Sequence, residues 1–159
     1  MKGGMRVRRA FLLLAFALAL WSAVLAHEAL PVSAPSAAPQ KKWILIELDM
    51  KRLTLYQGTT VLKRYPIASG AWSTPSPIGV FTVIGRFKTE MSGFGTRFLR
   101  LNVPWGVYGI HGTNRPDSIG ANASHGCIRL RVADAEALYA MVPNGTRVYL
   151  EGGPYGPLG

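Results

Sequence analysis

Residues 111–131 read HGTNRPDSIGANASHGCIRLR, and this stretch organises the rest of the chain. It contains the only cysteine of the protein, Cys127, and two of its three histidines, His111 and His125. Three glycines and no apolar period distinguish it from an ordinary core element. A thiol, two imidazoles and tight-turn glycines in one segment are typical of a nucleophilic cysteine site. The first hypothesis is that Cys127 attacks an acyl group.

A lone cysteine is more often a small buried hydrophobe than a nucleophile, and that is the alternative for Cys127. Two observations favour a reactive role for Cys127. An exported protein with an unpaired cysteine keeps a free thiol in an oxidising compartment. The preceding dipeptide, His125-Gly126, can turn sharply and direct backbone N–H groups into one space. An acyl transferase needs such groups for its oxyanion, so we expect an oxyanion hole at His125, Gly126 and Cys127.

A thiol at its ordinary pKa is mostly protonated at neutral pH and needs a base. His111 ends an expected strand and is the candidate base, whereas His125 is expected to shape the loop. The second ring nitrogen of His111 needs an acceptor, and Asp117 or a backbone carbonyl such as that of Gly112 could supply it. Taken alone, a histidine such as His111 is more often a hydrogen-bonded residue at the end of a strand; the cysteine in the same segment favours the base.

A zinc site is a rival interpretation of the same residues. His111, His125 and Cys127 would supply three ligands, enough for a catalytic metal with an open position. Ligands two residues apart around a glycine give poor tetrahedral geometry, and the usual paired spacings are absent. We therefore expect no metal and no cofactor.

The chain before this domain has the pattern of an export signal. A basic segment, residues 2–9, precedes an apolar run, residues 10–25, and small residues around Ala26 suit a signal peptidase. We expect a signal peptide over residues 1–26, with an uncleaved membrane anchor as the alternative, and a Pro/Ala/Ser linker over residues 27–42. The domain would cover residues 43–151, and a flexible tail residues 152–159.

Within the domain, apolar periodicity predicts many short strands and one helix. Strands are expected near residues 43–48, 53–56, 61–68, 80–87, 97–103, 107–111 and 146–150, and a glycine-containing loop over residues 90–95. Val132, Ala135, Leu138 and Tyr139 fall at helical spacing, and Pro143 ends that helix. The expected fold class is mostly β: a β-sandwich of mixed sheets with one short α-helix after the catalytic loop.

The charge balance of the chain favours an anionic partner. The formal net charge is +10; four of the 18 basic residues lie in the leader, which leaves 14 basic against eight acidic residues beyond it. Such a balance suits nucleic acid, a membrane surface or an acidic wall polymer. The basic residues are dispersed and no nucleic-acid motif accompanies them, so we expect no nucleic-acid partner.

Two motifs resemble a known family. Ile110-His-Gly-Thr113 followed by Ser124-His-Gly-Cys-Ile-Arg-Leu130 is similar to the signature of the L,D-transpeptidase catalytic domain. The resemblance extends to Thr74-Pro-Ser-Pro-Ile-Gly79, Gly95-Thr-Arg97 and Val142-Pro-Asn-Gly-Thr146, and covers roughly residues 43–150.

The resemblance implies a residue set. Cys127 would be the nucleophile and His111 the base, oriented by the carbonyl of Gly112. The positions implied for substrate binding are Arg129, Ser124, Tyr108 and Asn114. A guanidinium at Arg129 suits a substrate carboxylate, and a structural ion pair is its alternative.

The resemblance also implies a reaction outside the cytoplasm, in the periplasm or cell wall. Cysteine attack at the third residue of a peptidoglycan stem peptide would release D-alanine, and the side-chain amine of another stem would then take the acyl group, forming a 3-3 cross-link. With water as acceptor the protein would be an L,D-carboxypeptidase. A non-catalytic wall-binding module is the alternative from another class. A membrane would be a partner only if the leader stays uncleaved.

Overall fold

The computed structural model describes residues 40–153. The expected signal peptide, most of the expected linker and most of the expected tail lie outside these residues, so their boundaries stay predictions. Within residues 40–153, no helix is long and apolar enough to cross a membrane.

Ten strands and two helical segments make up the described domain. In chain order they are β1 (Lys42–Glu47), β2 (Arg52–Gln57), β3 (Thr60–Pro66), β4 (Ser69–Gly70), β5 (Gly79–Ser92), β6 (Gly95–Leu101), β7 (Tyr108–Gly112), the 3-10 turn η1 (Pro116–Ser118), β8 (Asn122–Ser124), β9 (Ile128–Leu130), α2 (Val132–Met141) and β10 (Arg147–Glu151).

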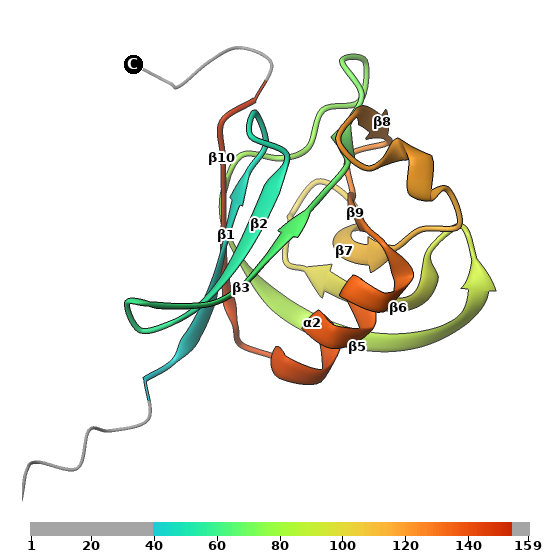
Figure 1. The fold of residues 1–159 in the computed structure, drawn as a ribbon. Helices are drawn as coiled ribbons and strands as arrows, with labels where there is room; N and C mark the ends of the chain where they lie inside the picture. Colours follow the sequence, from blue (N-terminus) through green and yellow to red (C-terminus); the bar gives the residue numbers. More distant parts are fainter. Residues whose placement is uncertain (1–39, 154–159) are drawn as a thin grey trace, which may run out of the picture. The chain divides into compact units, whose positions relative to one another are not determined.

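Eight strands form one mixed sheet in the order β3-β2-β1-β10-β5-β6-β7-β9, and β4 pairs with β8 (Figure 1). The pairs β1–β10, β7–β9 and β4–β8 are parallel, and the other pairs are antiparallel. The long strand β5 belongs to both halves of the sheet, because its first part pairs with β10 and its remainder with β6. The register shifts between Val83 and Gly85, and such irregularities bend a strand. This bend lets the two halves of the sheet face one core.

That core is a single apolar cluster contributed by both halves. Ile44 and Leu55 come from β1 and β2, and Leu99 and Ile110 come from β6 and β7. Helix α2 follows the 111–131 segment, as predicted, and buries Ala135 and Leu138. The predicted mostly-β fold with mixed sheets and one helix is therefore confirmed, although the two halves are continuous through β5.

Two local predictions were wrong. Residues 90–95 are not a simple loop, because β5 continues to Ser92 and β6 begins at Gly95, which makes a long hairpin. The Thr89 hydroxyl donates to the carbonyl of Gly95 at 2.9 Å and supports this hairpin next to its turn. The segment after β7 also contains the short strands β8 and β9, which apolar periodicity could not reveal in three residues each.

Candidate active site

Strands β7 and β9 bring the candidate residues together by register. They run parallel, with Ile110 opposite Ile128 and His111 opposite Arg129. Both isoleucines are 1% exposed in the core. Because side chains alternate along a strand, His111 and Arg129 lie on the other face, and so does Cys127, two residues before Arg129. The imidazole on β7 and the thiol of the residue just before β9 therefore face the same side.

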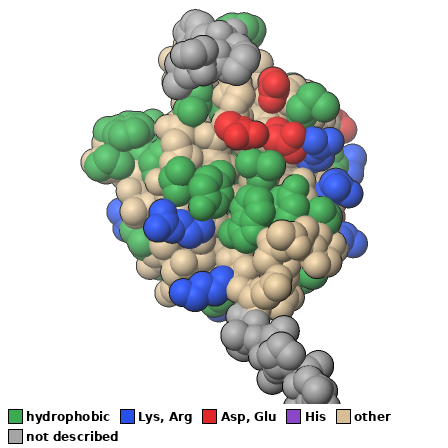
Figure 2. All heavy atoms as spheres, turned by 90° about the vertical axis from the view of Figure 1, so that its left-hand side faces the viewer, with side chains coloured by type: hydrophobic (Ala, Val, Ile, Leu, Met, Phe, Trp, Pro, Cys, Tyr) green, Lys and Arg blue, Asp and Glu red, His purple; other side chains and the backbone are tan. Residues whose placement is uncertain are grey.

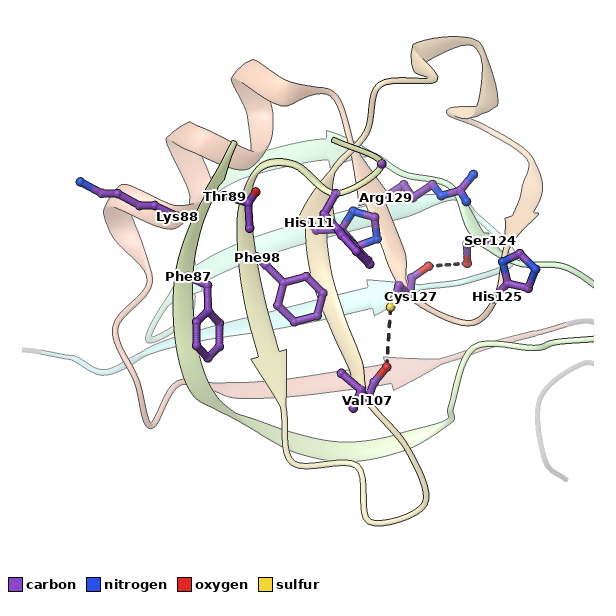
Figure 3. A pocket seen from close by; sticks show the side chains of 12 residues that line it. Phe87, Lys88, Thr89, Phe98, Val107, His111, Ser124, His125, Cys127 and Arg129 are labelled. Atoms are coloured by element: carbon purple, nitrogen blue, oxygen red, sulfur yellow. Dashed lines mark hydrogen bonds between the residues drawn. The ribbon is translucent and has the colours of Figure 1, made fainter. Parts of the chain in front are cut away.

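That side opens into a cavity of about 740 Å³. Its lining residues come from the β5–β6 hairpin, from β7 and the residue before it, and from the segment that runs from the end of β8 into β9: Phe87, Lys88, Thr89, Gly93, Phe94, Phe98, Val107, His111, Ser124, His125, Cys127 and Arg129 (Figure 3). The hairpin supplies an aromatic wall opposite the histidine and the thiol. The same cavity therefore holds a thiol, an imidazole and a guanidinium beside an apolar surface.

His111 is buried and its ring is held on three sides. Its Nδ1 contacts the backbone carbonyl of Gly112, and a carbonyl only accepts, so Nδ1 carries the proton. Its Nε2 is then the basic nitrogen. Phe98 stacks on the ring at 5.7 Å between centroids, and Phe94 meets it edge-on at 5.0 Å. Burial lowers the pKa of His111 below its ordinary 6.5, and Arg129 lowers it further, against the opposing effect of the Gly112 hydrogen bond.

Cys127 is half-buried and is not in a disulfide. Its Sγ lies 4.0 Å from the carbonyl oxygen of Val107. Burial raises the pKa of the thiol above 9.0, against a backbone hydrogen bond from Gly109 and the charge of Arg129, which both lower it. The lowered imidazole pKa and the raised thiol pKa both favour the neutral forms of His111 and Cys127.

The turn before Cys127 is fixed by Ser124. Its hydroxyl accepts the N–H of Gly126 at 3.0 Å and donates to the carbonyl of Cys127 at 2.5 Å. Gly126 has φ +110°, and an added Cβ would come 2.5 Å from the ring of Tyr108. Among residues 40–153, the N–H groups of His125 and Cys127 have no hydrogen-bond partner. Two of the three expected donors are therefore available, and the Gly126 N–H already has a partner.

Arg129 has a buried side-chain nitrogen that no other described group satisfies, its Nε. Both backbone groups of Arg129 are hydrogen-bonded: its N–H donates to the carbonyl of Ala68 at 2.9 Å, and its carbonyl accepts the N–H of Ala68 at 3.0 Å. Its side chain lines the cavity beside His111. A buried guanidinium nitrogen without a partner is suited to an anion that enters the cavity.

The structure does not bring every expected site residue into the cavity. Asn114 and Asp117 are exposed and do not line it. Tyr108 is half-buried and packs on Gly126 instead of lining the cavity. His125, by contrast, does line the cavity, and its side chain is exposed to solvent there.

Sequence reasoning missed the residues of the β5–β6 hairpin. Phe94 and Phe98 touch the ring of His111, and Lys88 is also among the lining residues, with its ammonium directed away from the other side chains (Figure 3). The signal that could have found them is the pair of phenylalanines on both sides of a glycine, Phe94 and Phe98 around Gly95, close to a strand turn. Their contact with His111 depends on the β6–β7 register, which places Phe98 directly opposite His111.

The alternative of a zinc site is not supported by any set of ligands in the described part of the chain. In residues 40–153, no group of three or more His, Cys, Asp or Glu side chains is arranged to hold a metal ion. His111, His125 and Cys127 all line the cavity, but their side chains do not form such a group.

Comparison with known proteins gives the family. The model of the L,D-transpeptidase catalytic domain (YkuD) matches residues 41–150. The Bacillus subtilis protein named as the L,D-transpeptidase YkuD is 45% identical over 105 residues, which cover 66% of this chain and 63% of that protein. The Bacillus licheniformis protein of the same name is 41% identical over 114 residues, which cover 72% of this chain and 67% of that protein. This chain thus spans about two thirds of the length of these curated relatives.

Solved structures agree with this match. An L,D-transpeptidase from Xylanimonas cellulosilytica superimposes with a TM-score of 0.59 at 27% identity, covering 72% of this chain and 62% of that one. A mutant of the Enterococcus faecium L,D-transpeptidase shares the fold, with a TM-score of 0.62 at 24% identity over 71% of this chain and 50% of that one. The chain belongs to the L,D-transpeptidase catalytic domain family.

Proposed function

We propose that this protein is a cysteine L,D-transpeptidase that cross-links peptidoglycan stem peptides through their third residues. The observation that carries the proposal is the shared cavity of Cys127 and His111, whose imidazole is held by Gly112 with Nε2 unprotonated. Strand β7 carries His111, and the residue just before the neighbouring strand β9 is Cys127, so both side chains face one side of the sheet. Nucleophilic acyl transfer needs such a pair at hydrogen-bonding reach when substrate is bound.

In the first half-reaction, Sγ of Cys127 attacks the carbonyl carbon of the third residue of the donor stem. As the C–S bond forms, Nε2 of His111 takes the thiol proton. The tetrahedral intermediate then collapses, the C–N bond to D-alanine breaks, and the imidazolium returns its proton to the leaving amine. The products are D-alanine and a thioester on Cys127.

The developing oxyanion would be held by backbone donors of the turn. The N–H groups of His125 and Cys127 support this role because no described group uses them. The N–H of Gly126 serves the turn instead, through Ser124. Removing one oxyanion donor typically costs about 10²–10³ in rate in other acyl-transfer enzymes.

In the second half-reaction, the side-chain amine of another stem attacks the thioester. His111 takes a proton from this amine and returns it to the sulfur as the C–S bond breaks. The aromatic wall of Phe87, Phe94 and Phe98 supports an amine acceptor over water, because an apolar surface at the thioester disfavours ordered water. The carboxypeptidase reaction is the alternative if water enters.

Arg129 would bind a carboxylate of the donor stem. Its buried Nε lacks a partner and its side chain lines the cavity beside the base. A guanidinium can form two parallel hydrogen bonds to one carboxylate, which would fix the orientation of the stem. The partners are thus two stem peptides, a donor tetrapeptide and an acceptor amine, and the site of action is the periplasm or cell wall.

The test is the identity of the products from a purified stem tetrapeptide. We expect free D-alanine and a peptide dimer joined between third residues, with neither product from the Cys127→Ala protein. Release of D-alanine with tripeptide and no dimer would replace the proposal with the carboxypeptidase. No release at all would favour the wall-binding module.

A further inference from the structure

A second groove, distinct from the catalytic cavity, lies at the start of strands β1 and β10. It has a volume of about 620 Å³ and is lined by Lys41, Lys42, Trp43, Pro143, Asn144, Gly145, Thr146, Arg147 and Tyr149. None of these residues lines the catalytic cavity. The groove therefore has a lining that the proposed reaction does not use.

Aromatic rings form one side of the groove. Trp43 stacks on Tyr56 at 4.1 Å between centroids and meets Tyr149 edge-on at 5.5 Å. The indole N–H of Trp43 donates to the carbonyl of Gly58 at 2.7 Å, which fixes the ring. Tyr149 stays 38% exposed. Such fixed, partly exposed rings offer apolar faces and polar edges, the combination that packs against the C–H faces of sugar rings.

Charge is distributed unevenly along this face of the sheet. The groove has three basic residues and no acidic residue in its lining. The acidic residues of these strands, Glu47 and Glu151, face each other four positions further along. Figure 2 shows this side of the molecule, with hydrophobic side chains over its middle, acidic ones just above them beside basic ones, and further basic ones below. An anionic ligand would therefore favour the end of the strands that holds Lys41, Lys42 and Arg147.

The far wall of the groove is rigid before any ligand arrives. The N–H of Gly145 donates to the carbonyl of Val83 at 2.8 Å, and the N–H of Val83 donates to that of Thr146 at 2.9 Å. The hydroxyl of Thr146 bonds the carbonyl of Pro143 at 2.8 Å. The ammonium of Lys42 donates to the carbonyl of Met141 at 2.9 Å. A preformed wall lowers the entropy lost on binding.

We infer that this groove binds a glycan strand of peptidoglycan. The sugar rings would pack on Tyr149 and Trp43, and carboxylates of attached stems would lie against Lys41 and Arg147. This inference rests on the proposed function, because it makes the groove a second contact with the polymer whose stems react at Cys127. It predicts that substitutions in the groove weaken binding of the peptidoglycan polymer and leave the reaction of isolated stem peptides unchanged.

The experiment measures co-sedimentation of the full-length Cys127→Ala protein with purified peptidoglycan stripped of accessory phosphate polymers. Arg147→Glu and Tyr149→Ala are expected to weaken binding about tenfold. The matched control is Arg64→Glu, which makes the same charge change at an exposed position of β3 outside the groove. It should bind like the parent protein.

A second measurement separates this inference from the proposed function. With Cys127 restored, Arg147→Glu should form dimers from soluble stem tetrapeptides at the parental rate. Equal loss of binding in Arg147→Glu and Arg64→Glu would overturn the inference, because net charge alone would then explain it. Unchanged binding in both Arg147→Glu and Tyr149→Ala would also overturn the inference. So would a parent protein that binds peptidoglycan only when the phosphate polymers are still attached. Failure of the soluble reaction in the parent protein would instead reject the proposed function.

Discussion

The imidazole of His111 lies nearly parallel to the ring of Phe98, with 5.7 Å between centroids and 14° between planes. The two residues face each other directly across β6 and β7. One flank of the proposed base is thus covered by a ring from the β5–β6 hairpin. The hairpin therefore packs against the imidazole of His111 as well as lining the cavity.

We predict that Phe98→Leu slows acylation of Cys127 by about tenfold, since a misplaced base loses part of the 10²–10⁴-fold contribution of proton transfer. Stopped-flow measurement of acylation gives the rate. Phe87→Leu is the matched control, because Phe87 lines the same cavity, is 48% exposed and has no ring contact with His111. If both variants slow acylation equally, the stacking has no special role.

The turn at Gly126 provides a test with an internal control. Gly126 and Gly120 both have positive φ, +110° and +97°, so alanine strains either backbone by about 1–3 kcal/mol. Only at Gly126 does the new Cβ meet an atom, the ring of Tyr108, and that overpacking adds about 1–3 kcal/mol. Urea unfolding should show a larger loss of stability for Gly126→Ala. Equal losses would show that Tyr108 does not constrain the turn.

Ser124 and Ser118 provide a second matched pair. Ser124→Ala leaves the N–H of Gly126 and the carbonyl of Cys127 without their partner, which should cost about 1–3 kcal/mol and slow acylation. Ser118→Ala removes an exposed hydroxyl that donates to Arg115 in the same segment, and should change stability by less than about 0.5 kcal/mol. Thermal unfolding and acylation kinetics measure both. A Ser124→Ala protein with parental kinetics would remove Ser124 from the description of the site.

The pH dependence of thiol alkylation follows from the pKa shifts of the resting pair. Burial raises the pKa of Cys127 above 9.0, so the thiolate fraction, and with it the rate of alkylation by iodoacetamide, should still be rising at pH 9. Burial lowers the pKa of His111 below 6.5, so the neutral base persists under mild acid and substrate acylation should fall only below pH 6.5.

A preformed thiolate–imidazolium pair would behave in the opposite way. Alkylation would then reach its plateau near or below neutral pH, because such pairs lower the thiol pKa. Mass spectrometry of the alkylated protein at a series of pH values distinguishes the two cases. A plateau below pH 7 would contradict the neutral pair.

The sequence predicts the reactive residues of the site better than it predicts the hairpin that surrounds them. Cys127 and His111 stand out because reactive residue types are rare and lie close to glycines. The hairpin was underestimated because Phe87 and Lys88 are both exposed, so no alternation of apolar and polar residues reveals the end of β5.

Other features depend on register and packing, which one sequence does not encode locally. The contact between Phe98 and His111 needs the pairing of β6 with β7. The unpartnered Nε of Arg129 and the use of the Gly126 N–H by Ser124 appear only when the turn is folded. The expectation for Asn114 rested on resemblance, and the side chain lies exposed outside the cavity.

The central claim is that His111 deprotonates Cys127 as the sulfur becomes acylated. Intact-mass measurement after mixing with a stem tetrapeptide, followed by peptide mapping, tests it most directly. We predict an acyl adduct on Cys127 that is absent from Cys127→Ala and forms at least about 100-fold more slowly in His111→Ala. An adduct that survives in Cys127→Ala, or forms at the parental rate in His111→Ala, would contradict the claim.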